Sequence, residues 1–258
     1  HLLGAVLGFQ VPTILKALLG EENTVYDGDF WRVRSPIEQA ASIKVPTFVV
    51  GGLHDLFQRS EPMWFERLKD RVPTKLLIGP WSHIAAAGVP DDGLPADGVP
   101  AMNHILLHWF DQYVKGLDVG ADKIPNVTQY VKGLDRYVTS TDWPHPQVRA
   151  ERLFLRGDKS LNPTAPAGDE ATSMVIQHPI GGICSQSLSQ WTAGLLGLLP
   201  LPCFTDDGAD QVPSAVFSTP VMTEDYYING PIQADIWIST TALESGLSVR
   251  VSDYDPAT

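Results

Sequence analysis

Residues 45–55 read VPTFVVGGLHD, a β-branched run that ends at two glycines and is followed by a histidine and an aspartate. A short apolar run that ends at glycines is typical of a buried strand in a parallel sheet. Residues 60–71 follow with an acid and a proline in their first turn and with Trp64, Phe65 and Leu68 at helical spacing. We therefore predict a strand, a loop and a helix, with Asp55 at the carboxyl edge of the strand.

The same unit begins again directly afterwards. Pro73 ends the helix, residues 74–78 (TKLLI) form a second predicted strand, and residues 79–83 (GPWSH) follow it. His83 is thus expected beyond the neighbouring strand, at the same sheet edge as Asp55. A further helix is predicted over 101–115, with a broad apolar face that should pack on the sheet. The fold class of this half is α/β.

The second half of the chain has a different pattern. Pro144 and Pro146 in a polar stretch indicate a linker, and a second domain is expected to begin near Arg149. Short alternating segments separated by turn residues are typical of a β-sandwich or jelly roll. The predicted strands cover 152–155, 216–221, 232–240 and 247–254, and in the third of them Ala234, Ile236 and Ile238 should face inward while Asp235 and Ser239 face outward.

Composition limits the partners. The chain has 258 residues, 43% of them hydrophobic, and a net charge of −12, so it can bury a sizeable core. Without a basic stripe, nucleic acid and anionic membranes are poor partners. Residues 2–19 are apolar but interrupted by polar residues and a proline, which predicts a buried helix or the tail of a helical subdomain instead of a membrane span. We expect a soluble protein, either from a bacterial cytoplasm or exported.

Cys184 and Cys203 are too few and too far apart for a zinc motif, and the sequence leaves open whether they are thiols or one disulfide. The chain starts at His1 without a methionine and stops soon after a predicted strand. We therefore expect it to be a partial chain, cut at both ends.

Asp55 and His83 have the residue types and placement of the acid and base of a Ser-His-Asp triad. The sequence contains no Gly-x-Ser-x-Gly motif, and in an α/β-hydrolase the nucleophile precedes the acid, so the serine would lie upstream. In the alternative interpretation, Asp55 caps a turn and His83 is an ordinary loop histidine. His54 is a second candidate base, although an extended loop would point it away from its neighbour Asp55.

Four segments, at 30–36 (FWRVRSP), 45–55, 78–83 and 109–116 (WFDQYVKG), resemble in order and spacing the cocaine-esterase and Xaa-Pro dipeptidyl-peptidase family of α/β-hydrolases. The resemblance covers residues 26–258. It implies the end of a helical cap over 1–25, the C-terminal part of an α/β-hydrolase domain over 26–148, and an incomplete, galactose-binding-like jelly roll over 149–258. Asp55 matches the triad acid of the family and His83 its base, so this chain alone should be inactive.

The resemblance also implies a substrate pocket. Phe57 matches a position that lines the acyl pocket of the esterase relatives, and His54 and Trp81 are expected beside it. The amino-acid ester hydrolase branch of the family carries acidic residues where this chain has Phe57 and Gln58, which argues against that branch. Residues 181–184 (GGIC) align with a loop that leans over the active site.

The predicted function is that of a serine hydrolase that cleaves a carboxylic ester or amide through an acyl-enzyme. The expected partners are a small-molecule substrate and the missing N-terminal part of the same protein, with no cofactor and no metal; oligomer formation stays open. The alternatives are an Xaa-Pro dipeptidyl-peptidase and a non-catalytic jelly-roll binding module or inactive fragment. His104 and His108 have the spacing of a zinc pair but no evident third ligand, and the apolar run at 191–199 is expected to be buried between domains.

Overall fold

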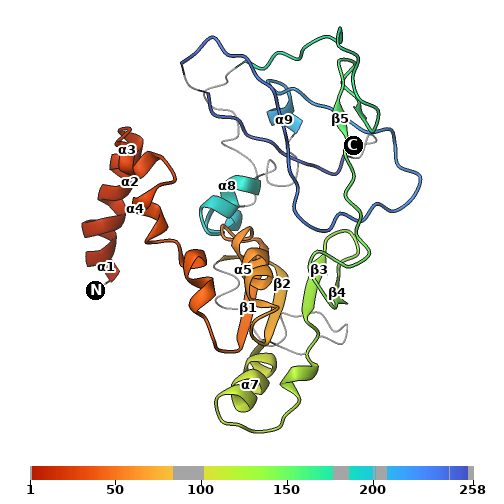
Figure 1. The fold of residues 1–258 in the computed structure, drawn as a ribbon. Helices are drawn as coiled ribbons and strands as arrows, with labels where there is room; N and C mark the ends of the chain where they lie inside the picture. Colours follow the sequence, from red (N-terminus) through yellow and green to blue (C-terminus); the bar gives the residue numbers. More distant parts are fainter. Residues whose placement is uncertain are drawn as a thin grey trace.

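Four strands form a mixed sheet in the order β1–β2–β3–β4 in the computed structural model, which describes residues 2–83, 102–176, 186–199, 201, 208–243 and 245–254 (Figure 1). The parallel strands β1 and β2 are adjacent, β3 continues the sheet in parallel, and β4 returns antiparallel to β3. The predicted strands at 45–50 and 74–78 are confirmed, although the first begins only at Thr47, and both extend further than expected at their carboxyl ends. The bounds are Thr47–His54 for β1, Thr74–Ser82 for β2, Val127–Val131 for β3 and Arg136–Ser140 for β4.

Two helices, both predicted from periodicity, pack on the sheet. Helix α5 (Ser60–Leu68) connects β1 to β2, and helix α7 (Met102–Tyr113) follows β2. Successive side chains of a strand point to opposite faces, and the two core clusters divide in this way. Leu76 packs in one cluster with Phe65 of α5, whereas Leu77 packs in the other with Ile105 of α7. The predicted α/β class is therefore confirmed for this half, with hydrophobic packing on both faces of β2.

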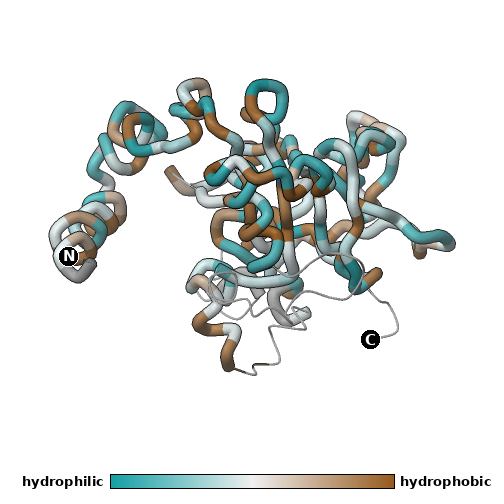
Figure 2. Tube along the Cα trace, turned by 90° about the horizontal axis from the view of Figure 1, so that it is seen from below, coloured by the Kyte–Doolittle hydropathy of each residue, from teal (hydrophilic) through white to brown (hydrophobic). Residues whose placement is uncertain are grey.

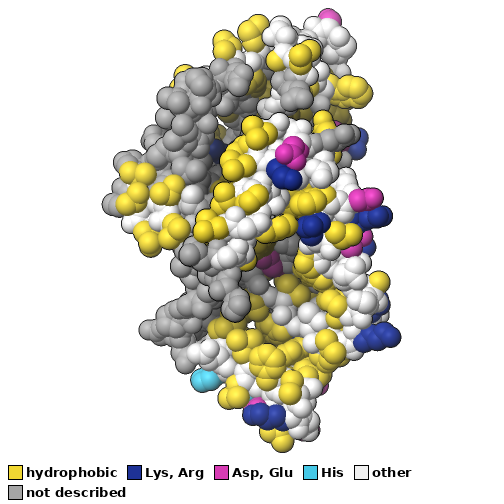
Figure 3. Space-filling model, turned by 90° about the vertical axis from the view of Figure 1, so that its left-hand side faces the viewer, with side chains coloured by type: hydrophobic (Ala, Val, Ile, Leu, Met, Phe, Trp, Pro, Cys, Tyr) yellow, Lys and Arg dark blue, Asp and Glu magenta, His cyan; other side chains and the backbone are white. Residues whose placement is uncertain are grey.

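The N-terminal helices extend away from the sheet (Figures 1 and 2). They are α1 (Leu2–Ala5), a π-helical turn η1 (Val6–Gln10), α2 (Val11–Leu18), α3 (Glu22–Val25) and α4 (Asp29–Arg32), and a 3₁₀ segment η2 (Pro36–Ser42) leads into β1. The expected buried helix is wrong, because the large apolar side chains of α2 are exposed, Leu18 by 77%. Hydrophobic side chains cover much of the face seen in Figure 3. The other interpretation, the tail of a helical subdomain, stays a prediction.

The C-terminal half has little regular structure among its described residues. Strands β5 (Phe154–Leu155) and β6 (Leu161–Asn162) pair antiparallel, and Ser218 adds one bridge to Ser160. The strands predicted at 232–240 and 247–254 are wrong: no described neighbour pairs with these segments, and alternation alone does not make a strand without one. Ala234 and Ile238 are exposed, and Ile236 is half-buried.

Four further short helical elements lie in the described part of the chain: η4 (Ala121–Lys123), α8 (Gln186–Trp191), η5 (Leu196–Leu198) and α9 (Gly208–Gln211). The predicted burial of the apolar run at 191–199 is wrong, since Trp191 is 75% exposed and Leu198 79% exposed. Cys184, Cys203 and the turn at 181–184 lie outside the described residues.

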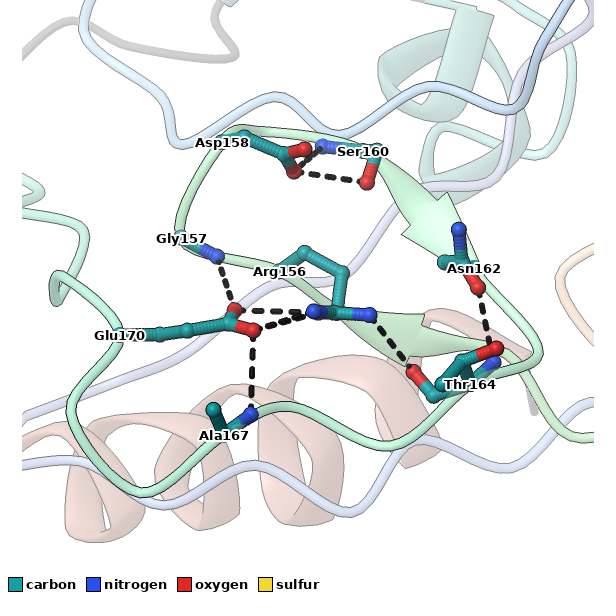
Figure 4. A network of polar contacts seen from close by, with 8 residues as sticks. All are labelled: Arg156, Gly157, Asp158, Ser160, Asn162, Thr164, Ala167 and Glu170. Carbon is teal, nitrogen blue, oxygen red and sulfur yellow. Dashed lines mark hydrogen bonds and ion pairs between the residues drawn. The ribbon is translucent and has the colours of Figure 1, made fainter.

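A polar network holds together the loop that surrounds β5 and β6 (Figure 4). The Arg156 guanidinium donates to both carboxylate oxygens of Glu170 and to the Thr164 carbonyl. The same carboxylate accepts the backbone N–H groups of Gly157, at 2.8 Å, and Ala167, at 3.1 Å. The Arg156 hydrogen bonds, with those N–H groups, lower the pKa of Glu170 to about 2.

This lowered pKa predicts an acid-dependent opening of the loop. Because folding lowers the pKa of Glu170, its contribution to stability is complete above pH 4.5 and is lost as the pH falls toward 2. We expect the amide proton signals of Gly157 and Ala167 to shift together with a midpoint near pH 2 in an NMR titration, and Glu170→Gln to remove that transition. A midpoint close to pH 4.5 would contradict the network.

Candidate active site

Asp55 and His83 meet where β1 and β2 end. His54 and Ser82 are the last residues of β1 and β2 and are register partners. Asp55 and His83 therefore each lie one position beyond the end of a strand. The Nδ1 atom of His83 lies 3.1 Å from Oδ2 and 3.2 Å from Oδ1 of Asp55. The Asp55 side chain is 5% exposed and the His83 side chain 47% exposed. Because Nδ1 faces the carboxylate, Nε2 is the ring nitrogen left to meet a third group.

Backbone geometry holds the carboxylate in this position. The Asp55 N–H donates to the Gly52 carbonyl, and the Phe57 N–H donates to Asp55 Oδ1 at 2.9 Å. A backbone donor satisfies one lone pair of the buried carboxylate without occupying the edge that faces the imidazole. The turn at 55–58 therefore aims the acid at His83.

Trp81 explains one glycine on each strand, Gly52 of β1 and Gly79 of β2. A Cβ atom at Gly52 would overlap the Trp81 carbonyl, and one at Gly79 would overlap the Trp81 ring. The ring lies in the core cluster with Leu77 and Met102 and is 6% exposed. The Trp81 side chain thus supports the strand ends from within the core, and its expected place beside a substrate pocket stays a prediction.

The other two predicted pocket residues lie near the surface. Phe57 is half exposed, and its ring meets the His83 imidazole edge to face at a centroid distance of 5.4 Å. His54 is the last residue of β1 and is half-buried, so the extended loop expected around it is instead a strand. Burial, with a smaller contribution from the charge of Lys132, lowers the pKa of His54. Of the two candidate bases, His83 is the one whose ring contacts the Asp55 carboxylate.

Glu61 is a further ionisable group near this end of the sheet, one that the sequence analysis did not single out. Its carboxyl packs against Gly51 of β1, and Oε2 is buried without a hydrogen-bond partner among the described residues. Burial raises the pKa of Glu61 to about 7; its backbone hydrogen bond and the His83 charge oppose the rise, and the Asp55 charge adds to it. An acid in the first turn of a helix looks like an ordinary dipole partner in sequence, which concealed this one.

Gln190 of α8 also reaches the site, although it is 135 residues away from Asp55 in sequence. Its Nε2 donates to the Asp55 carbonyl at 2.7 Å. Figure 1 shows α8 above β1. No signal in the sequence indicated this contact, because its two partners come from different halves of the chain.

Comparison with known proteins identifies the family. The family model described as the X-Pro dipeptidyl-peptidase C-terminal non-catalytic domain matches residues 119–258, more than half of the chain. The chain belongs to this X-Pro dipeptidyl-peptidase family. A second model, X-Pro dipeptidyl-peptidase (S15 family), matches residues 14–85 and so includes both Asp55 and His83. The resemblance that the motifs indicated is confirmed.

Individual X-Pro dipeptidyl-peptidase relatives and related hydrolases match parts of the chain. A cocaine esterase from Rhodococcus sp. (strain MB1 Bresler) is 24% identical over 97% of this chain and 45% of its own length. A putative Xaa-Pro dipeptidyl-peptidase from Streptomyces avermitilis is 28% identical over 44% of this chain and 16% of its own length. The chain thus spans less than half the length of the curated relatives it matches.

Solved structures also show similarity. An aminopeptidase from a marine sediment Thaumarchaeota archaeon matches with a TM-score of 0.44 and 24% identity, over 55% of this chain and 25% of its own. A CocE/NonD family hydrolase from Staphylococcus aureus matches with a TM-score of 0.41 and 18% identity, over 53% of this chain and 24% of its own.

Two features are absent from the described part of the chain. None of its helices has the length and apolarity that a membrane span requires. Among the same residues, no three His, Cys, Asp or Glu side chains gather closely enough to hold a metal ion. His104 and His108 are exposed on α7.

Proposed function

We propose that this chain supplies the acid and the base of a Ser-His-Asp triad to a serine hydrolase that cleaves a carboxylic ester or amide. The observation that carries the proposal is the contact of the His83 Nδ1 atom with the buried Asp55 carboxylate at the ends of two adjacent parallel strands. In the α/β-hydrolase arrangement both residues follow the nucleophile in chain order. The serine and the oxyanion-hole donors then lie upstream, in the part of the protein that this chain does not span.

In the proposed mechanism each residue has its own step. His83 Nε2 takes the proton of the serine hydroxyl as the oxygen attacks the substrate carbonyl, and it returns that proton to the leaving alcohol or amine. Asp55 keeps the Nδ1 proton in place and stabilises the imidazolium that forms. Water then releases the acyl group by the same proton transfers in the deacylation half of the reaction.

The proposal extends to the domain boundaries of the chain and to the residues that line the substrate pocket. We infer a cap end over 1–25, a hydrolase part over 26–148 and a jelly roll over 149–258; the match of the C-terminal family model supports the last of these. Phe57 is half exposed beside the imidazole, where an aromatic ring suits an apolar acyl group. His54, the last residue of β1, is proposed to border this pocket.

A second candidate is an Xaa-Pro dipeptidyl-peptidase, which the description of both matching family models favours. The two candidates share the triad and differ in the substrate that the pocket accepts. Parallel assays with a short-chain aryl ester and with Ala-Pro-p-nitroanilide separate them by the ratio of kcat/KM values.

Fluorophosphonate labelling of the full-length protein tests the proposal. We expect the label on one serine upstream of this chain, and we expect no label on the chain alone, because fluorophosphonates react with a serine that a neighbouring histidine activates. Full-length protein that takes no label and hydrolyses neither substrate would show that the Asp55–His83 pair has no catalytic role.

A further inference from the structure

A segment of the C-terminal half contacts the backbone of Asp55 and the residue that precedes His83. Gln190 donates its Nε2–H to the Asp55 carbonyl at 2.7 Å. Four residues later, Gly194 lies so close to Ser82 that an added Cβ atom would overlap the Ser82 hydroxyl. Ser82 directly precedes His83. We call residues 189–198 the α8 segment. This segment therefore contacts the turn at 55–58, which holds Asp55, and the end of β2, which leads to His83.

The α8 segment is itself held in shape by internal hydrogen bonds. The Gly194 N–H donates to the Ser189 carbonyl at 2.7 Å, and the Leu196 N–H donates to the Thr192 hydroxyl at 3.3 Å. Gly194 has a φ of +95°, a conformation that other residues rarely adopt. This turn therefore presents Gln190 from a defined backbone and not from a loose loop.

The hydrogen bond from Gln190 is made to the backbone carbonyl of Asp55, and the orientation of this backbone sets the direction of the Asp55 carboxylate. The Asp55 carbonyl accepts Gln190 Nε2 and also the N–H of Gln58, while the Asp55 N–H donates to Gly52. A rotation of the Asp55 backbone would break these bonds and turn the carboxylate away from the imidazole. Among the described residues, Gln190 is the donor to the Asp55 carbonyl that comes from outside the turn itself.

We propose that Gln190 is a positioning residue that fixes the Asp55 peptide, and through it the carboxylate that orients His83. This inference rests on the proposed function. It goes beyond the comparisons, because Gln190 lies in the region that the family model describes as non-catalytic. It also gives the C-terminal half a direct physical link to the proton-transfer pair.

Gln190→Leu tests the inference, since leucine keeps the approximate size and removes the donor. In the full-length protein we expect kcat to fall about tenfold with KM within a factor of two, because a small misplacement of a catalytic group slows the reaction without weakening substrate binding. Gln190→Glu should lose at least as much activity, because a carboxylate cannot donate and sets a charge against the Asp55 carbonyl. The exposed Gln147→Leu is the matched control and should keep the wild-type kcat.

A second readout needs no activity. In this chain alone, the His83 Nδ1–H proton that bonds to Asp55 should give a downfield NMR signal, which Gln190→Leu should weaken or move upfield. An unchanged signal together with wild-type kcat would overturn the inference, and so would a raised KM with unchanged kcat, which would assign the α8 segment to substrate binding. If Gln190→Leu does not fold, the near-isosteric Gln190→Glu decides by the same measurements. If instead the full-length enzyme proves not to be a serine hydrolase, the NMR signal still tests the contact separately.

Discussion

Asp55→Asn in the full-length protein is expected to lower kcat by about four orders of magnitude. Asparagine keeps the shape of the side chain, but its amide nitrogen offers a proton where the carboxylate accepts one, so the His83 ring is held in the wrong tautomer or loses its partner. The Nδ1 atom of His83 lies within 3.2 Å of both Asp55 oxygens, so either orientation of the amide disturbs the pair.

Ester hydrolysis under saturating substrate measures this loss, and His83→Ala should lose at least as much because it removes the base itself. The matched control is His104→Ala, which removes an exposed histidine of α7. Thermal unfolding of the variants should stay close to that of the wild type. Nearly normal turnover by either site variant would contradict the assignment of the triad residues.

Glu61→Gln is expected to make the chain more stable at pH 8, by about 1–2 kcal/mol because solvent screening reduces the effect of the full pKa shift, and to leave its stability almost unchanged at pH 4. Burial raises the pKa of Glu61 from 4.5 to about 7, so the folded chain holds this proton more tightly than the unfolded chain. Stability therefore falls as the pH rises from 4.5 to 7 and then stays constant. A glutamine is neutral throughout and does not incur this loss.

Urea unfolding at the two pH values measures the difference. Glu66→Gln, on the exposed side of the same helix, is the control and should change the free energy of unfolding by less than about 0.5 kcal/mol at either pH. A Glu61→Gln chain that is less stable than the wild type at pH 8 would contradict the prediction, because it would mean that the ionised carboxylate makes a stabilising contact.

The sequence allowed the prediction of those parts of the fold in which local pattern and tertiary packing agree. The β-branched run before Gly51 contains core-packing residues, and the helical spacing of Trp64, Phe65 and Leu68 includes two fully buried ones, Phe65 and Leu68, so β1 and α5 were predictable. The positions of Asp55 and His83 followed from the geometry of parallel strands alone.

Other features depend on partners that no local pattern reveals. The segment 232–240 alternates like a strand, but a strand requires a neighbour, and among the described residues it has none. Gln190 contacts Asp55 across 135 residues, and the burial of Glu61 depends on its packing against Gly51. The apolar character of residues 2–19 predicts burial only where another surface covers them, and the large apolar side chains of α2 are exposed.

The packing of Leu76 and Leu77 on opposite faces of β2 has a mechanical consequence for the pair. Twisting β2 about its own axis would separate Leu76 from its cluster with Phe65 or Leu77 from its cluster with Ile105. The torsional freedom of the strand is therefore restricted on both sides, and the direction in which the chain leaves β2 toward His83 is fixed by apolar contacts several residues earlier. A substitution that changes the side-chain volume at Phe65 of α5 or Ile105 of α7 should therefore rotate the His83 imidazole, although neither residue makes a polar contact in the site.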